Sequence, residues 1–160
     1  MGNYTFMSDD KTYVMKPIGY VRCPQLKTHD DFKKKPKGEP ISAEAVLSNE
    51  LAEAIDEIET FDHVWLIWVF DKNVGQGYKV KIYPHPDPEH QRGIFVTRTP
   101  FRPNPIGLSC VKVLGREGNI LKFANSDIYD GTPILDIKPY IPSSDSRPDS
   151  KAGWISDLGL

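Results

Sequence analysis

The sequence predicts a mainly β protein, built as one small β-barrel domain with one or two helices. Short apolar or alternating segments, about seven in all, recur at the spacing typical of barrels and sandwiches. One segment has helical periodicity, and the chain has neither a strand–helix rhythm nor an internal repeat, which does not fit a doubly wound nucleotide-binding fold. Its 160 residues suffice for a single domain with its own hydrophobic core.

The first half of the chain is predicted to hold two strands, a long loop and one helix. Tyr13–Arg22 mixes β-branched and aromatic residues with polar ones, which predicts a first strand. Cys23–Pro40 is rich in lysine and proline and is expected to be a loop, followed by a short strand at Ala43–Leu47. Ser48 can cap a helix over Asn49–Ile58, whose apolar residues cover one face.

The second half is predicted to hold further strands joined by tight turns. Val64–Phe70 is an apolar run typical of a strand buried on both faces, and Tyr78–Tyr83 alternates as a half-buried strand does. We also expect strands at Gly93–Thr97, Leu108–Leu114 and Ile120–Phe123, and a turn at Asp130–Pro133. Residues 1–142 are expected to form the barrel domain and residues 143–160 a polar C-terminal tail.

Composition limits the function classes. A net charge of −2 does not favour a protein that coats nucleic acid non-specifically. Five lysines in the segment Lys27–Lys37 form either an ordinary solvated surface or a phosphate-facing patch.

The longest apolar run is too short to cross a membrane, so no membrane association is expected. Cys23 and Cys110 lie far apart, and we expect them to be reduced core residues of a cytoplasmic protein.

Motifs for metal binding and nucleophilic catalysis are weak. His85–His90 contains residue types that bind metals, but its prolines splay the side chains and no second ligand pair follows, so no metal site is predicted. Ser109 follows a glycine yet lacks the G-x-S-x-G elbow of a nucleophilic serine. The sequence has no G-x-x-x-x-G-K-[ST] phosphate-binding motif.

The segment Thr97–Ser109, TRTPFRPNPIGLS, is the most informative about function. Proline fixes φ and pushes the preceding residue toward extended geometry, so Arg102 and Asn104 should point in fixed directions. Arginine offers forked donors to a carboxylate or phosphate, and asparagine can donate and accept at once, as reading an adenine edge requires. The residues alone leave two interpretations open, a ligand-facing wall or a rigid barrel-closing loop with surface arginines.

Three blocks of sequence, in this order, resemble the TsaA-like (TrmO) family of S-adenosyl-L-methionine-dependent methyltransferases: FDHVWLIWVF, GIFVTRTPFRPNPIGLS and DGTPILDIKPYIP. The segment PIGYVRCP matches the opening strand of the family more loosely. The resemblance implies a small β-barrel rather than a Rossmann methyltransferase fold. It further implies a homodimer that binds S-adenosyl-L-methionine near the dimer interface and N6-methylates threonylcarbamoyl-adenosine next to the tRNA anticodon.

Two other functions stay open at this stage. A methyltransferase with the same cofactor could act on a small-molecule acceptor instead of tRNA. A non-catalytic dimer that binds S-adenosyl-L-methionine would show binding without turnover on any acceptor. Salt-dependent binding of tRNA distinguishes the first function from the other two, and turnover distinguishes the second from the third.

The resemblance also assigns residues to the cofactor site. They are Asp71, Lys72, Arg98, Leu108, Asp130, Gly131, Thr132 and Pro133. The sequence departs from the family pattern at Asp71, where members usually have histidine. It departs again in Leu26–Pro40, which has no clear match to the family's Pro-Arg-Gln element.

The implied reaction mainly requires alignment of the acceptor nitrogen with the methyl group, which can supply about 7–11 kcal/mol in favourable systems. A nitrogen between adenine and a carbamoyl group is a poor nucleophile until it loses its proton. Our candidates for the base are Asp136, Asp130 and Tyr140, in that order. Our candidates for orienting the substrate are Arg102, Asn104 and Lys138.

Overall fold

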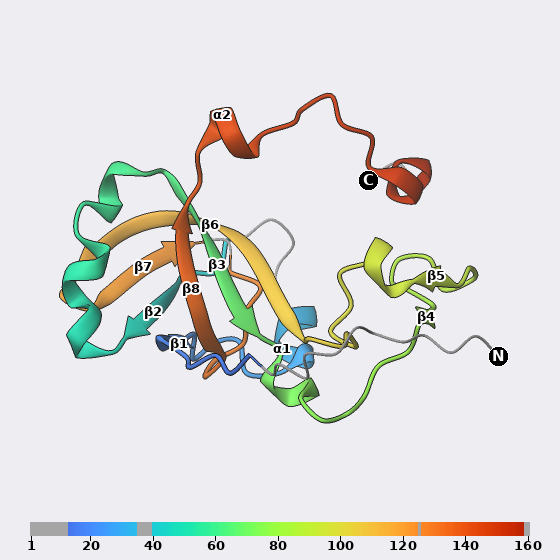
Figure 1. The fold of residues 1–160 in the computed structure, drawn as a ribbon, viewed down its shortest axis with the longest axis horizontal. Coiled ribbons are helices and arrows are strands. Elements are labelled where there is room, and N and C mark those ends of the chain that lie inside the picture. Colours follow the sequence, from blue (N-terminus) through green and yellow to red (C-terminus); the bar gives the residue numbers. More distant parts are fainter. Residues whose placement is uncertain (1–12, 35–39, 125, 159–160) are drawn as a thin grey trace.

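The fold is a closed antiparallel β-barrel with an extension on one side. The computed structural model describes residues 13–34, 40–124 and 126–158. Six of the described strands close the barrel in the order β1 (Gly19–Arg22), β2 (Ala43–Leu47), β7 (Ile120–Ala124), β6 (Ile106–Glu117), β3 (His63–Val69) and β8 (Pro133–Pro139). The predicted mainly β barrel is therefore confirmed (Figure 1).

The central strand β3 shows how the barrel core is built. Its side chains alternate, with Val64, Leu66 and Trp68 buried inside the barrel and the intervening residues half-buried on the outside. The expectation that this run is buried on both faces was wrong, because a barrel strand faces the core on one side only. Phe123 and Leu121 on β7 are among the other fully buried residues of this core.

Trp68 packs directly onto the backbone of Gly107 on the neighbouring strand β6, with which it is paired. A β-carbon at position 107 would lie 2.3 Å from Trp68 Cε2, far inside van der Waals contact. The indole nitrogen donates to Ser109 Oγ at 3.2 Å, and that hydroxyl donates to Asp127 Oδ1 at 2.9 Å. Glycine is therefore the residue that allows the indole to fill this end of the barrel.

The predicted helix over Asn49–Ile58 was wrong in type. The segment forms two 3₁₀ helices, η1 (Asn49–Ile55) and η2 (Ile58–Thr60). They are separated by Asp56 in extended geometry and by Glu57 at φ 62°, a left-handed conformation. The side chain of Ser48 makes no capping hydrogen bond. The break lets both Ile55 and Ile58 pack into the same core. Packing against the barrel determines this break, and the local periodicity of the sequence does not indicate it.

Three predicted strands were too long. Tyr13–Arg22 is strand only from Gly19, because Pro17 has no amide hydrogen and pairing begins after it. Within Tyr78–Tyr83 only β4 (Lys81–Ile82) is strand, and Tyr78 and Val80 are 57% and 73% exposed rather than half-buried. Gly93–Thr97 contributes Gly93 to β5 (Arg92–Gly93) and then turns into the 3₁₀ helix η4 (Ile94–Val96).

The other predicted elements are confirmed in position. β2 matches its expected bounds, β6 and β7 contain the two expected strands, and Asp130–Pro133 is a turn in which Gly131 has φ 79°. Cys23 is buried as expected, but the prediction for Cys110 was wrong, because its side chain lies on the exposed outer face of β6. Among the described residues, no helix is long and apolar enough to cross a membrane.

The extension, residues 74–104, leaves the barrel between β3 and β6 and contains β4, β5 and η4. Figure 1 shows the C-terminal segment leaving β8 past α2 (Pro142–Asp145) and returning to the extension, where η5 (Gly153–Leu158) lies. Trp154 Nε1 donates to the carbonyl of Val96 at 2.8 Å, which holds the two segments together. The division of the chain at residue 142 into a domain and a tail stays a prediction.

We predict that Gly107→Ala destabilises the protein by about 1–3 kcal/mol, because the added methyl group overpacks against the indole of Trp68. The free energy of unfolding in urea measures the effect. Gly93→Ala is the matched control, because a β-carbon at position 93 would meet no atom within 4 Å and the φ of Gly93 is −61°, so its change should stay within about 0.5 kcal/mol. Equal effects of the two substitutions would contradict this account of the barrel core.

Candidate functional site

One end of the barrel, here called the loop mouth, collects the segments from which most candidate residues come. Val69 at the end of β3 pairs with Ile106 at the start of β6, and Trp68 pairs with Ile134 near the start of β8. Tyr20 of β1 pairs with Pro133. Residues 23–34, 70–105 and 126–132 therefore project from the same end of the barrel.

Lys72 connects two of these segments. It lies in the 3₁₀ helix η3 (Asp71–Asn73), directly after β3. Its ammonium group donates to the carbonyl of Lys27 at 3.2 Å and lies 5.1 Å from the centre of the Tyr129 ring, within cation–π range. Asp71 is exposed in the same turn. The predicted polar pair after the aromatic strand is thus placed beside the segment that leads to Asp130.

The turn at residues 129–133 is fixed to β1 by hydrogen bonds. Asp130 Oδ1 accepts from the amide of Cys23 at 2.7 Å, and Gly131 donates its amide to the carbonyl of Val21 at 2.8 Å. Thr132 is buried and its carbonyl accepts from the amide of Val21. One oxygen of the Asp130 carboxylate therefore holds the turn, and within the described part of the chain no group donates to the second oxygen of this half-buried residue.

Two pKa shifts indicate which groups at the loop mouth keep their protons. Burial and, to a smaller extent, the negative charge of Asp130 raise the pKa of the Cys23 thiol to about 11. A thiol with this pKa is not a nucleophile at neutral pH. Burial also raises the pKa of Tyr129, with a smaller effect from Asp31. The Tyr129 ring therefore faces Lys72 as a neutral phenol.

The first loop contains a short helix, α1 (His29–Lys34), with a reciprocal cap. Thr28 Oγ1 accepts from the amide of Asp31 at 3.3 Å, and the Asp31 carboxylate accepts from the amide of Thr28 at 2.8 Å. The hydrogen bond from the Thr28 hydroxyl is the main reason that the pKa of Asp31 is lowered. The cap orders the start of the lysine-rich segment, of which Lys35 and Lys37 lie outside the described residues.

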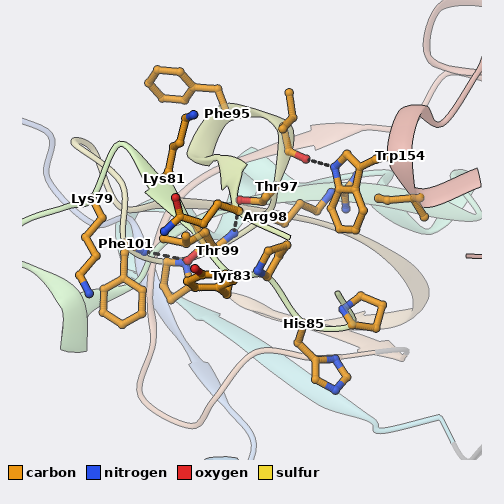
Figure 2. Close-up of a pocket in the computed structure, with 17 residues that line it drawn as sticks. Lys79, Lys81, Tyr83, His85, Phe95, Thr97, Arg98, Thr99, Phe101 and Trp154 are labelled. Atoms are coloured by element: carbon orange, nitrogen blue, oxygen red, sulfur yellow. Dashed lines mark hydrogen bonds between the residues drawn. The ribbon is translucent and has the colours of Figure 1, made fainter. Parts of the chain in front are cut away.

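Arg98 lies in a cavity of about 1060 Å³ between the extension and η5 (Figure 2). Lysines, aromatic rings and threonines line the same cavity, and Trp154 closes one side of it. Arg98 is exposed. It comes from the proline-rich segment, which is itself attached to the loop mouth through the hydrogen bond from Phe70 to the carbonyl of Pro105 at 2.8 Å.

Arg102 and Asn104 differ in what they contact. Arg102 Nη1 donates to the carbonyls of Ile94 and Thr97 at 3.2 and 2.9 Å, and its guanidinium lies 5.6 Å from the Phe95 ring centre. In this conformation Arg102 braces the extension. Asn104 is exposed, and its carbonyl accepts from the amide of Ile106 in a tight turn. Asn104 therefore lies at the surface, and its role in orienting the substrate stays a prediction.

The remaining candidates lie away from the loop mouth. Leu108 is exposed on the outer face of β6. Asp136 and Lys138 share the outer face of β8 and form an ion pair at 2.7 Å. Tyr140 follows the far end of β8, where its ring packs 5.7 Å from that of Trp65. Because a strand rises about 3.3 Å per residue, Tyr140 and Asp130 lie roughly 20 Å apart and do not share one site within a chain.

Comparison with known proteins supplies the family. The model of the tRNA-methyltransferase O N-terminal domain matches residues 23–146. The chain belongs to this family. Its relatives include a protein of Pyrococcus abyssi named "Probable S-adenosyl-L-methionine-binding protein", which is 41% identical over 148 residues, or 88% of this chain and 74% of the relative.

The family also contains enzymes and solved structures. The Escherichia coli tRNA (adenine(37)-N6)-methyltransferase is 40% identical over 108 residues, 64% of this chain and 46% of the enzyme. A crystal structure of TrmO superposes with a TM-score of 0.71 at 33% identity, covering 89% of this chain and 64% of that one. The chain thus spans less than half of the Escherichia coli enzyme and under two thirds of the TrmO chain.

Two residues at these sites were not predicted from the sequence. Tyr129 immediately precedes the turn that the family resemblance assigns to the cofactor site. An aromatic residue next to Asp130 was the sequence signal that could have identified it as a site residue. Trp154 lies in the segment expected to be a polar tail. A lone tryptophan in such a segment suggests a docking contact, but its partner at Val96 is 58 residues away and no pattern indicates it.

An ion cluster braces the side of the cavity that Trp154 closes. The buried Asp87 carboxylate accepts from His90 Nδ1 at 2.9 Å and from Arg92 Nη2 at 2.8 Å. The guanidinium of Arg92 lies 5.2 Å from the Trp154 ring centre. The hydrogen bonds from His90 and then Arg92 lower the pKa of Asp87 to about 2. His90 thus serves a hydrogen bond to Asp87 within the His85–His90 segment.

We predict that Asp87 stabilises the protein at neutral pH and loses this effect in acid. Its pKa is lowered by folding, so the stabilisation is complete above the ordinary aspartate value of about 3.9 and disappears as pH falls through about 2. The free energy of unfolding is measured for wild type and Asp87→Asn from pH 7 to pH 2. The difference in the free energy of unfolding between wild type and Asp87→Asn should be constant from pH 7 to about pH 4 and shrink at lower pH. A difference that does not change with pH would contradict the account.

Proposed function

We propose that this chain is an S-adenosyl-L-methionine-dependent N-methyltransferase that acts on tRNA. One observation carries the proposal. Three connections that are distant in sequence project from one mouth of the barrel: residues 23–34, residues 70–105 with Lys72 and the proline-rich block, and residues 126–132 with Asp130. Membership of the tRNA-methyltransferase O family supports the reaction class, and the names of the relatives support the cofactor.

The side chains at the loop mouth have the chemistry that this cofactor requires. Lys72 would hold the carboxylate of the methionine part, since its ammonium group lies at the edge of the mouth. The second carboxylate oxygen of Asp130 would accept from a ribose hydroxyl with one lone pair, which leaves its other lone pair for a proton of the acceptor. The Tyr129 ring, which already faces one cation, offers the kind of surface that a sulfonium favours. The bound cofactor supplies an activated methyl group.

The resemblance extends the proposal to further cofactor residues. Arg98 is proposed as a second cation for the cofactor, and Leu108 as an apolar contact. Gly131, Thr132 and Pro133 would approach it through the turn that is hydrogen-bonded to β1. Asp71 takes the place of the histidine usual in the family, and its exposed carboxylate is proposed to accept a hydrogen bond from the cofactor.

We propose that the active form is a homodimer, because some of the candidates lie on the outer face of the barrel. Ile106 and Leu108 are 40% and 49% exposed there, an apolar surface next to the half-buried Trp65 of β3. A second copy placed on this face would cover it and bring Asp136, Lys138 and Tyr140 of one chain toward the loop mouth of the other. Cytoplasmic location stays a prediction from the sequence.

The proposed acceptor is the N6 nitrogen of threonylcarbamoyl-adenosine next to the anticodon. Its nitrogen must lose a proton, and of the three candidate bases only Asp130 lies at the loop mouth of the same chain. Asp136 would serve if the second copy supplies it. Asn104, whose side chain lies at the surface of the proline-rich segment, is proposed to contact the modified base, with Lys138 and Arg102 as further contacts.

We predict transfer of labelled methyl from S-adenosyl-L-methionine to tRNA that carries threonylcarbamoyl-adenosine, with none to tRNA lacking this modification or to the free nucleoside. Asp130→Asn retains the oxygen that accepts from Cys23, so it should fold, and should lower kcat by at least about 100-fold if Asp130 is the base. The same measurement of kcat on Asp136→Asn tests the alternative base.

Each outcome of this assay has a separate meaning. Loss in Asp136→Asn alone would assign the base to the outer face of the second copy. Turnover on a small acceptor and not on tRNA would contradict the tRNA proposal. Binding of the cofactor without turnover on any acceptor would contradict the proposal that the chain is an enzyme.

A further inference from the structure

The cavity between the extension and η5 has features that the cofactor proposal does not explain. Its volume of about 1060 Å³ is at the upper limit of small-molecule pockets, which hold roughly 300–1,000 Å³. Its walls come from two segments far apart in sequence, residues 79–101 and residues 154–155. Only Arg98 among its lining residues is a proposed cofactor contact.

The side chains that line the cavity combine cations with accessible aromatic rings. Lys79, Lys81 and Arg98 supply positive charge, and none of the 17 described lining residues is acidic. Tyr83, Phe95 and Phe101 are 60%, 75% and 44% exposed, although rings of this size are usually buried. Figure 2 shows Lys79 beside Phe101 at one end of the group, with Trp154 and His85 at the other.

We propose that this cavity is a binding site for unpaired nucleotides of RNA. Bases would stack on Phe101 and Tyr83, and backbone phosphates would pair with Lys79 and Lys81. Sites for single-stranded nucleic acid join these two features, because every base has a flat face and every linkage a negative charge. The inference rests on the proposed function. It adds the position of the RNA strand relative to the cofactor, with Arg98 between the RNA site and the cofactor site.

The C-terminal segment forms one wall of this site in a fixed position. The Trp154 indole donates to the carbonyl of Val96, and the Arg92 guanidinium packs against its ring. Arg92 is in turn held by Asp87. A ring fixed before binding loses little entropy when a ligand stacks nearby. The segment expected to be a polar tail is therefore assigned to substrate binding.

The test uses the full chain and a short RNA hairpin with an unpaired loop, followed by fluorescence anisotropy at several salt concentrations. A fully paired duplex of the same length is the second probe. The variants are Phe101→Ala and the double variant Lys79→Ala/Lys81→Ala, all three at exposed positions. The control is Lys122→Ala on β7, at the side of the barrel away from the extension (Figure 1).

We expect the hairpin to bind more tightly than the duplex. Phe101→Ala should weaken hairpin binding about 5- to 150-fold, as loss of one stacking surface does. The double lysine variant should reduce the slope of log affinity against log salt by about 1.4, or about 0.7 for each lost phosphate contact. Lys122→Ala should leave both quantities unchanged.

Calorimetric titration with S-adenosyl-L-methionine separates this inference from the proposed function. If wild type binds the cofactor and the hairpin, and the cavity variants bind the hairpin as wild type does, the inference is wrong and the proposed function stands. Equal effects of Lys122→Ala and the cavity variants would also overturn it. If wild type binds neither the cofactor nor the hairpin, both proposals fail.

Discussion

Closure of the barrel is the constraint on which the rest of the structure depends. Because β8 pairs with both β1 and β3, the six strands of the described barrel satisfy one another's backbone hydrogen bonds without leaving an edge. Antiparallel pairing then decides where each connection projects. The segments after β1 and β3 and those before β6 and β8 must share one mouth, whatever their sequence. The packing of Trp68 on Gly107 fills the core at that end and keeps the strands close.

In this arrangement the barrel is the rigid support, and the connections that it positions carry the candidate site residues. The turn at Asp130 is held to β1 by backbone and carboxylate hydrogen bonds, so its geometry is set by the barrel. The proline-rich segment is anchored at Phe70 and braced from within by Arg102. The segment closes the connection to β6 and also carries Arg98 at a cavity, and its ligand-facing role stays a prediction.

The strands of the barrel were the most predictable part of the fold. Alternation placed β2, β6 and β7, since residues on a barrel strand face the core in turn. The same alternation gave a wrong prediction of a half-buried strand at Tyr78–Tyr83, because these residues lie in the extension and do not face the core. Helical periodicity misled at Asn49–Ile58, because the left-handed Glu57 breaks the segment. Family motifs located the cofactor candidates, but the docking of Trp154 is a distant contact without a local pattern.

The central claim is that the loop mouth holds S-adenosyl-L-methionine between Lys72 and the turn at Asp130. The most direct measurement is a titration of the ¹⁵N-labelled protein with S-adenosyl-L-methionine, followed by the chemical shifts of its backbone amides. The account predicts that the largest shifts occur at Lys72, Gly131 and Thr132, with β2 and β7 unchanged. Shifts confined to the far side of the barrel, or no shifts at saturating cofactor, would contradict it.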